Sequence, residues 1–289
     1  SGVCLGRTGA AQSPTRCFSM LEKPTVLYED NHLLAVNKPA GWHSVPNPGP
    51  ESPKCLLSEL KRMGRGGGSN KDFLLSLHRI DQPCTGILMF AKTGKAATRV
   101  STLWKKKMVK KQYLCVVSSD GIETLRRKSR IGNGEWLSLE GLMATPTKNR
   151  SSDKKRSVSI RPMDSRGPLP SDRHVSIEWQ QVQVRNGLPG FQAILVQTNE
   201  GARHMVRAIL AQVGRCPIAG DVRYNSGSTP LPDQSVALHA FRLSLDRSLK
   251  LGTLDTFDFQ APLPRTWNRF FGMSDKNIKV SVRRNSLKQ

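Results

Sequence analysis

A short polar cluster between two apolar segments holds the residues best suited to chemistry. His78, Arg79 and Asp81 follow the apolar run 73–77, and a second apolar run covers 87–91. A proline and a glycine between them favour a turn. The sequence therefore predicts an acid and a cation on a loop held by two buried segments, where functional side chains are common. The same residue types also fit a solvated turn, so the pattern alone leaves both interpretations open.

Lysines gather at the end of the segment 94–107, which has the periodicity of a helix, and just after it. Cations stabilise the carboxyl end of a helix through its dipole. Five lysines within seven positions also suit phosphate groups, so they are candidate RNA contacts. They are Lys105, Lys106, Lys107, Lys110 and Lys111.

Tyr113 lies in the predicted strand 112–117, where its ring fits a packed core as well as a site. Arg203 and Arg207 are four residues apart at the expected start of a helix in 198–213, so they are predicted to share one helix face. Cations are unfavourable there. We therefore expect an anion to compensate them, either a carboxylate or a phosphate.

The charge of the chain is strongly one-sided. Lys and Arg number 45 against 22 Asp and Glu in 289 residues, a net charge of +23. Such a field favours a polyanionic partner, nucleic acid first and an anionic membrane second. No apolar run approaches the roughly 20 residues that span a bilayer, and the charge is spread along the chain, which favours nucleic acid. The stretch 148–156, with Lys154, Lys155 and Arg156, is either an RNA contact or a solvated loop.

The remaining composition excludes several other classes. Six cysteines are too sparse for a disulfide scaffold and lack zinc-ligand spacing, so a reducing compartment and no metal are expected. The glycine-rich stretch 64–70 lacks the end of a phosphate-binding loop and predicts a flexible connection. The first 21 residues contain no acid. They resemble an organelle transit peptide, although an ordinary disordered arm has the same composition.

Taken together, the segments 26–41, 77–92, 111–117, 198–211 and 215–224 resemble the motifs of RluA-type pseudouridine synthases. The resemblance implies that Asp81 is the catalytic carboxylate, that Tyr113 lies against the target base as proton acceptor, and that Arg207 pairs with Asp81. It also matches His204 to the histidine of the third motif. Departures from the family pattern are Cys84-Thr85-Gly86 in the segment 77–92, which matches the catalytic motif, and Ala202, Met205 and Ile209 in the segment 198–211, which matches the third motif.

The fold that this resemblance implies is α/β (α+β): a mixed, largely antiparallel sheet in two halves, flanked by helices, with a central cleft. We expect an N-terminal arm at 1–23, a catalytic domain at 24–272 and a basic tail at 273–289. Within the domain, 120–174 looks less regular and contains a basic insertion at about 145–174. The strand near 175–184 changes its apolar phase, which predicts a bulge at Gln180-Gln181.

The implied activity is conversion of uridine to pseudouridine in RNA, without cofactor or metal. A partner cation favours the ionised form of a carboxylate, which is the role expected of Arg207, and Arg79 fills the space of a flipped-out nucleotide or holds a phosphate. The expected partner is ribosomal RNA, including a precursor of the large subunit, with assembly-factor or ribosomal-protein contacts through the insertion and tail. The alternative is an assembly factor that keeps the fold with little catalysis. A mitochondrial location is predicted from the N-terminus, otherwise a cytoplasmic or nuclear one.

Overall fold

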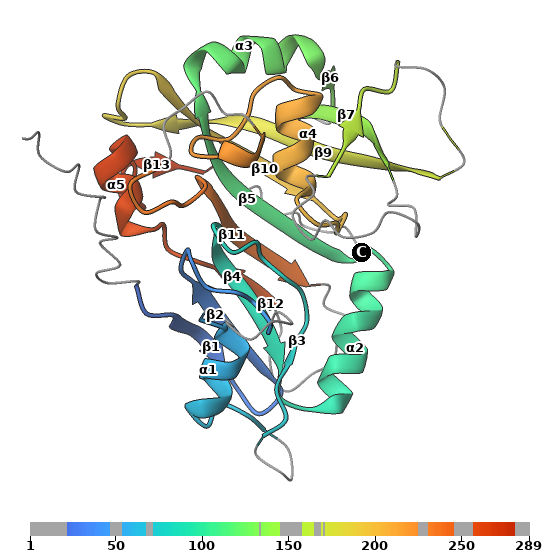
Figure 1. Ribbon diagram of the computed structural model, residues 1–289, viewed down its shortest axis with the longest axis vertical. Coiled ribbons are helices and arrows are strands. Elements are labelled where there is room, and N and C mark those ends of the chain that lie inside the picture. Colours follow the sequence, from blue (N-terminus) through green and yellow to red (C-terminus); the bar gives the residue numbers. More distant parts are fainter. Residues whose placement is uncertain are drawn as a thin grey trace, which may run out of the picture.

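A computed structural model shows a broad twisted sheet that carries helices on both faces (Figure 1). It describes residues 22–46, 54–67, 72–132, 134–144, 158–164, 169, 171–224, 231–245 and 257–280. No helix in these ranges is long and apolar enough to cross a membrane.

The first half of the sheet comes mainly from the N-terminal part of the chain. The sequence predicts two short strands at 25–28 and 32–37 around a turn, and they form a hairpin. Asp30 stabilises its turn by accepting hydrogen bonds from the backbone N–H groups of His32 and Leu33 at 2.7 and 2.6 Å. The elements of this part are β1 (Thr25–Glu29), β2 (Leu33–Lys38), α1 (Leu56–Arg62), β3 (Leu75–Ser76), β4 (Thr85–Ala91) and α2 (Gly94–Lys105).

The chain enters the second half through a long strand that runs diagonally across the molecule (Figure 1). The last strands then return to the boundary between the halves. The elements are β5 (Val109–Ser118), α3 (Ser119–Lys128), β6 (Arg130–Ile131), β7 (Leu137–Ala144), β8 (Ile160–Arg161), β9 (Asp172–Val184), β10 (Phe191–Thr198), α4 (Met205–Gln212), η1 (Val222–Tyr224), β11 (Leu238–Leu245), β12 (Phe257–Gln260), α5 (Arg265–Phe271) and β13 (Ile278–Lys279).

Strand pairing confirms the expected sheet. Its strands lie in the order β1, β2, β4, β11, β5, β10, β9, β7, β6, and each pairing in this series is antiparallel except that of β4 with β11. This parallel contact joins the two halves. At the joint Gly86 has φ +112°, and a Cβ there would lie 2.3 Å from the carbonyl oxygen of Ala240. Only glycine allows the two backbones to come this close.

Alternate residues of β2 show how the helices cover the first half. Leu33 and Ala35 pack with α2, whereas Leu34 and Val36 pack with α1. Since successive side chains of a strand point to opposite faces, the two helices lie on opposite sides of the sheet. The continuous apolar run of β4 follows from the same arrangement, because all of its residues are buried.

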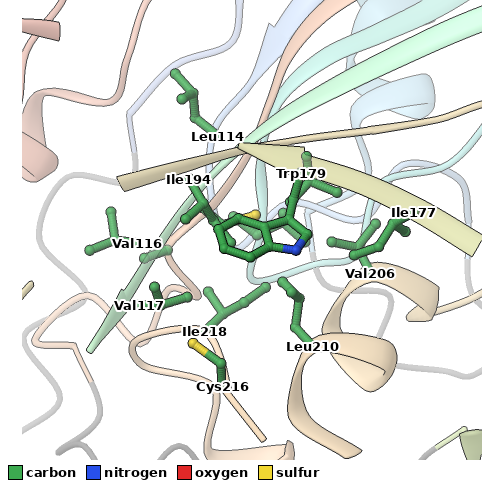
Figure 2. Packing of buried hydrophobic residues seen from close by; sticks show 14 of the residues in the cluster. Leu114, Val116, Val117, Ile177, Trp179, Ile194, Val206, Leu210, Cys216 and Ile218 are labelled. Carbon is green, nitrogen blue, oxygen red and sulfur yellow. The ribbon is translucent and has the colours of Figure 1, made fainter. Parts of the chain in front are cut away.

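In the second half, α4 covers the sheet around Trp179, whose side chain is almost fully buried. Its indole lies among Val206 and Leu210 of α4 and the neighbouring strand residues (Figure 2). Large aromatic side chains contribute strongly to such a core. This packing fixes the position of α4, and with it the position of every polar side chain on that helix.

Two expectations about 120–184 were wrong. The stretch expected to be irregular contains α3, β7 and the start of β9, and β7 pairs with β9 without interruption from Leu137 to Ala144. The bulge at Gln180-Gln181 is absent, because β9 pairs with β10 in continuous register through these residues. The change of apolar phase instead reflects cover on both faces: Trp179 packs with α4, while Val182 and Val184, which alternate to the opposite face, are buried and partly buried there. Residues 278–279, expected in a basic tail, pair with β9 and thus belong to the sheet.

Candidate active site

Two carboxylates and one guanidinium form an ion-paired cluster beside the joint of the two halves. Nη1 of Arg207 donates a hydrogen bond to Oδ2 of Asp81 at 2.8 Å, and its Nε and Nη2 bind the two carboxylate oxygens of Asp221 at 2.7 and 2.8 Å. The side chains of Arg207 and Asp221 are 4% and 1% exposed, whereas that of Asp81 is 22% exposed. Asp81 is therefore the member of the cluster that a ligand can approach.

The charge of Arg207 is secured by its surroundings. Burial opposes the charged form, but the hydrogen bonds to Asp221 and the negative charges nearby outweigh it and raise the pKa of Arg207. The guanidinium consequently stays charged, and its bidentate grip on Asp221 fixes its plane. Its remaining Nη1 is then directed at Asp81 without freedom to turn away.

The start of α4 explains how one arginine becomes buried and the other does not. The helix begins at Met205 after His204, which has the left-handed value φ 56°. Arg203 thus precedes the helix and is exposed, so the prediction that Arg203 and Arg207 share a helix face was wrong. The anions that compensate Arg207 are the carboxylates of Asp81 and Asp221, which settles in their favour the choice that the sequence left open.

Backbone hydrogen bonds hold the loop that carries Asp81. The N–H of Cys84 donates to the carbonyl of Asp81 at 3.0 Å, which closes a turn. Ser44 bonds both polar backbone groups of Ile80, since its Oγ donates to the carbonyl at 2.8 Å and accepts from the N–H at 3.0 Å. The N–H of Gly41 donates to the carbonyl of Gln82 at 2.8 Å. The segment after β2 therefore clamps the loop on both sides of the carboxylate.

Lys38 completes this clamp from inside the protein. Its Nζ donates to the carbonyl oxygens of Pro39 and Trp42 at 3.0 Å and of Gln82 at 3.3 Å, and the residue is fully buried. Burial lowers the pKa of Lys38 to about 8. An ammonium with three carbonyl acceptors is satisfied in the interior, and it ties the loop of Asp81 to the end of β2.

His204 lies beside Asp81 and is fixed by a hydrogen-bonded chain. Its Nε2 is 3.7 Å from Oδ2 of Asp81, and its Nδ1 is 3.2 Å from the hydroxyl oxygen of Tyr224. That oxygen also accepts the N–H of Val158 at 2.9 Å, an arrangement that favours donation of the hydroxyl proton to Nδ1. Burial lowers the pKa of His204 to about 4. The ring is thus neutral near pH 7, and donation from Tyr224 to Nδ1 favours the tautomer with its N–H at Nε2, on the side of Asp81.

Tyr113 is half-buried on β5 and interacts electrostatically with the negative charge of Asp81. Burial, reinforced by that negative charge, raises the pKa of Tyr113 above its ordinary value. The phenol is therefore protonated at neutral pH, and its phenolate, once formed, is a strong base.

The lysines expected to contact RNA differ in their surroundings. Lys105 and Lys106 are exposed at the end of α2, and Lys110 is partly buried. Lys107 is exposed but paired with Glu200 at 2.5 Å. Lys111 is buried, and its Nζ donates to the carbonyl of Glu200.

His78 and Arg79, which precede Asp81 by three and two residues, also lie in different surroundings. Arg79 is exposed next to the cluster, as an RNA contact requires. The ring of His78 instead stacks on Trp104 with centroids 5.1 Å apart, and its Nε2 accepts the N–H of Met89 at 3.1 Å. Burial lowers its pKa to about 3, so it carries no charge for a phosphate near neutral pH. Lys154, Lys155 and Arg156 lie outside the described residues.

Sequence reasoning missed the roles of Asp221, Lys38 and Tyr224. A signal for Asp221 was present, because a cation at a helix start called for an acid and 215–224 already matched a motif. Nothing in the pattern around Lys38 distinguished it from a surface lysine. Among the described residues, no cluster of three His, Cys, Asp or Glu side chains is arranged to hold a metal ion.

A sheet in two halves with a partly exposed aspartate paired with a buried arginine is the arrangement that the resemblance to RluA-type pseudouridine synthases implies. The chain belongs to the RNA pseudouridylate synthase family, whose sequence model matches residues 32–212.

Three relatives illustrate the range of similarity. An uncharacterized RNA pseudouridine synthase of Synechocystis is 28% identical over 226 residues, which cover 76% of this chain and 60% of that protein. The tRNA pseudouridine synthase C of Yersinia pestis is 26% identical, with 76% and 80% covered. The mitochondrial pseudouridylate synthase RPUSD4 of mouse is 26% identical, with 77% and 57% covered. The chain thus spans about 60% of the length of several relatives it matches.

Two solved structures share the fold. Human RNA pseudouridylate synthase domain containing 4 superposes with a TM-score of 0.59 at 18% identity, covering 87% of this chain and 95% of the other. Human RNA pseudouridylate synthase domain containing 1 gives a TM-score of 0.58 at 18% identity, with 85% and 86% covered.

Proposed function

We propose that this chain is the catalytic part of an RNA pseudouridine synthase that acts through Asp81. The observation that carries the proposal is the cluster in which Arg207, itself held by Asp221, presents the partly exposed carboxylate of Asp81 at the joint of the halves. A preorganised charged group of this kind needs no rearrangement when charge develops on a substrate.

The reaction needs a carboxylate beside the sugar of the target uridine. The bond from uracil N1 to C1′ breaks, the base turns, and a bond from C5 to C1′ forms. Asp81 either attacks as a nucleophile or stabilises the positive charge that develops on the sugar, and carboxylates perform both tasks in glycosyl chemistry. The product is an isomer of the substrate, so no oxidant, reductant or second substrate is consumed.

Tyr113 is proposed as the acceptor of the proton that C5 must lose. Because its phenol is protonated at rest, Tyr113 can accept this proton only by releasing its own. The released proton is delivered to N1, the uracil nitrogen that lost its bond to the sugar, so the isomerisation as a whole neither gains nor loses a proton. His204 offers its Nε2–H near Asp81, where it can bond to the carboxylate or to an oxygen of the bound nucleotide.

The departures from the family motif fit an active enzyme. Met205 and Ile209 replace polar residues of the third motif, and both are buried in the apolar cluster of the second half. They therefore change the packing of α4 without removing a group from the Asp81 cluster.

For the substrate, we propose structured RNA of the ribosome and a mitochondrial site of action. Support comes from relatives named as a ribosomal large subunit synthase in Rickettsia prowazekii and as mitochondrial synthases in vertebrates. A tRNA is the competing substrate, because the Yersinia relative is named for it. Assembly-factor and ribosomal-protein contacts through the basic insertion and tail stay predictions, since 145–157 and 281–289 lie outside the described residues.

The test uses purified protein with bulk RNA, separated into ribosomal and transfer RNA, and mass spectrometry of the digested nucleosides. Wild type is expected to form pseudouridine in one fraction. Asp81→Asn should lower turnover by on the order of 10⁴-fold while RNA affinity changes only a few-fold. Persistent turnover in Asp81→Asn would refute the role of this carboxylate. Wild type that binds RNA tightly without forming pseudouridine would instead support the assembly-factor alternative.

A further inference from the structure

The carboxylate of Glu200, in the loop between β10 and α4, binds two cations from different parts of the chain. Lys107, just after α2, binds Oε1 at 2.5 Å, and Arg173 of β9 binds Oε2. The buried Lys111 donates to the backbone carbonyl of Glu200, and the N–H of Glu200 donates to Oγ1 of Thr198 at 2.9 Å. Lys107 and Arg173 are therefore held at a fixed separation by a carboxylate whose own backbone is anchored.

Lys107 has an unusual backbone conformation for a residue with a side chain. Its φ of 57° lies in the left-handed region, where the N–H closes α2 by donating to the carbonyl of Trp104 at 3.1 Å. Glycine is the usual residue at such a position, and a side chain there costs free energy of about 1–2 kcal/mol. A non-glycine residue kept in this conformation motivates a functional hypothesis.

The cations keep capacity for a further anion. The side chains of Lys107 and Arg173 are 61% and 47% exposed, whereas that of Glu200 is 13% exposed. Lys107 and Arg173 pair with the carboxylate of Glu200 and Lys111 binds its backbone carbonyl, so three cations accompany one acid and the group is net positive. An ammonium has three donors and a guanidinium five, and Lys107 and Arg173 each donate one hydrogen bond to Glu200. Within the described part of the chain, their remaining donors are available on the exposed side.

The group lies on the side of the sheet that carries the proposed chemistry. Lys111 and Tyr113 are two apart on β5, so they face the same side about 7 Å from each other. The charge of Lys111 also reaches His78, three residues before Asp81. Figure 1 shows α2 leading directly into β5 at this end of the strand.

We propose that Lys107 and Arg173, positioned by Glu200, bind a single backbone phosphate of the RNA strand whose uridine enters the cleft. The proposal rests on the proposed function for its ligand. The occupant follows from charge: a net charge of +23 calls for a polyanion, and a phosphate fits a site where two exposed cations converge on one acidic group. Holding the strand beside Tyr113 fixes which nucleotide reaches Asp81.

The test measures affinity for a fluorescein-labelled single-stranded RNA of mixed sequence over a range of KCl concentrations. Each phosphate neutralised on a single strand contributes about 0.7 to the slope of log K against log salt. Lys107→Gly, which suits the left-handed backbone, and Arg173→Ala are each expected to make this negative slope shallower by about 0.7. The double variant should make it no shallower than that, because both side chains share one phosphate.

Lys61→Ala is the matched control, because this exposed lysine lies on α1, on the face of the sheet opposite to α2. The salt slope of this variant should equal that of wild type. Circular dichroism confirms that each variant is folded. Additive losses in the double variant would overturn the single-phosphate clamp, and so would unchanged slopes in the single variants. Binding is measured apart from turnover: pseudouridine formation with unchanged slopes removes only the clamp, whereas the expected slopes without any pseudouridine formation remove only the enzymatic proposal.

Discussion

The cluster around Arg207 and the cluster around Glu200 use the same chemical groups in opposite surroundings. Arg207 and Asp221 are 4% and 1% exposed, whereas Lys107 and Arg173 are 61% and 47% exposed. Charges removed from water are costly unless paired, so each buried member depends on the others. Exposed pairs keep their water and contribute little to stability. Burial thus makes one cluster a rigid holder of Asp81 and leaves the other able to exchange partners with an incoming anion.

The largest effect is expected from breaking the buried cluster. Asp221→Ala leaves the guanidinium of Arg207 buried with half of its partners missing, so the free energy of unfolding should fall by about 3–5 kcal/mol. Urea denaturation followed by circular dichroism measures it. If the free energy of unfolding fell by less than about 1 kcal/mol, the buried Arg207–Asp221 pair would contribute no more than an exposed ion pair, and the contrast between the clusters would be refuted.

The buried ammonium of Lys38 extends the comparison to pH. Burial lowers the pKa of Lys38 to about 8 from an ordinary value of 10.5, which the unfolded chain regains. Between these values the unfolded state binds more protons, so this group makes the fold more stable as pH rises. Relative to Lys38→Met, wild type should gain up to roughly 3 kcal/mol over that range. Parallel stability curves for the two proteins would show that Lys38 is not desolvated.

Tyr224→Phe tests the hydrogen-bonded chain that reaches Asp81 through His204. The variant keeps the ring but leaves the N–H of Val158 without its acceptor, at a cost of about 1–3 kcal/mol. Without the hydroxyl, Nδ1 of His204 can take the proton, so kcat is expected to fall about tenfold with KM little changed. His204→Asn serves as the companion variant, because asparagine tolerates the left-handed backbone and retains a donor. A kcat unchanged in Tyr224→Phe would contradict the positioning role.

The smallest effect belongs to the exposed cluster. Glu200→Gln keeps the shape and one acceptor oxygen but removes the charge, so stability should change by less than about 1 kcal/mol. The difference should shrink further in high salt, because exposed charges are screened. Thermal unfolding at low and high KCl measures both values, with Asp221→Ala as the reference. A loss of several kcal/mol that persists in salt would show that Glu200 is a structural anchor of the buried type.

Prediction from the sequence succeeded where burial left a simple pattern. The strand at 85–91 is apolar throughout because helices cover both faces, and the first hairpin has Asp30 in its turn. It failed at α3, where only Ile122 and Leu125 are buried among charged residues, and at the bulge expected in β9. In both cases the decisive information was which element lay against each face, and local periodicity does not contain it.

By itself, the sequence determined which groups had to find partners: an acid on a loop, a cation at a helix start and a large excess of positive charge. The resemblance implied the pairing of Asp81 with Arg207, but no local pattern of residues contained it, and the tertiary structure decided which groups meet. It joined Asp81 to Arg207 across 126 residues, left the nearby Arg203 in solvent, and gathered Lys107 and Arg173 on Glu200. The reason is physical: the energy of a charge depends on burial and on neighbours within a few ångströms, and both are set by packing between elements that are distant in the chain.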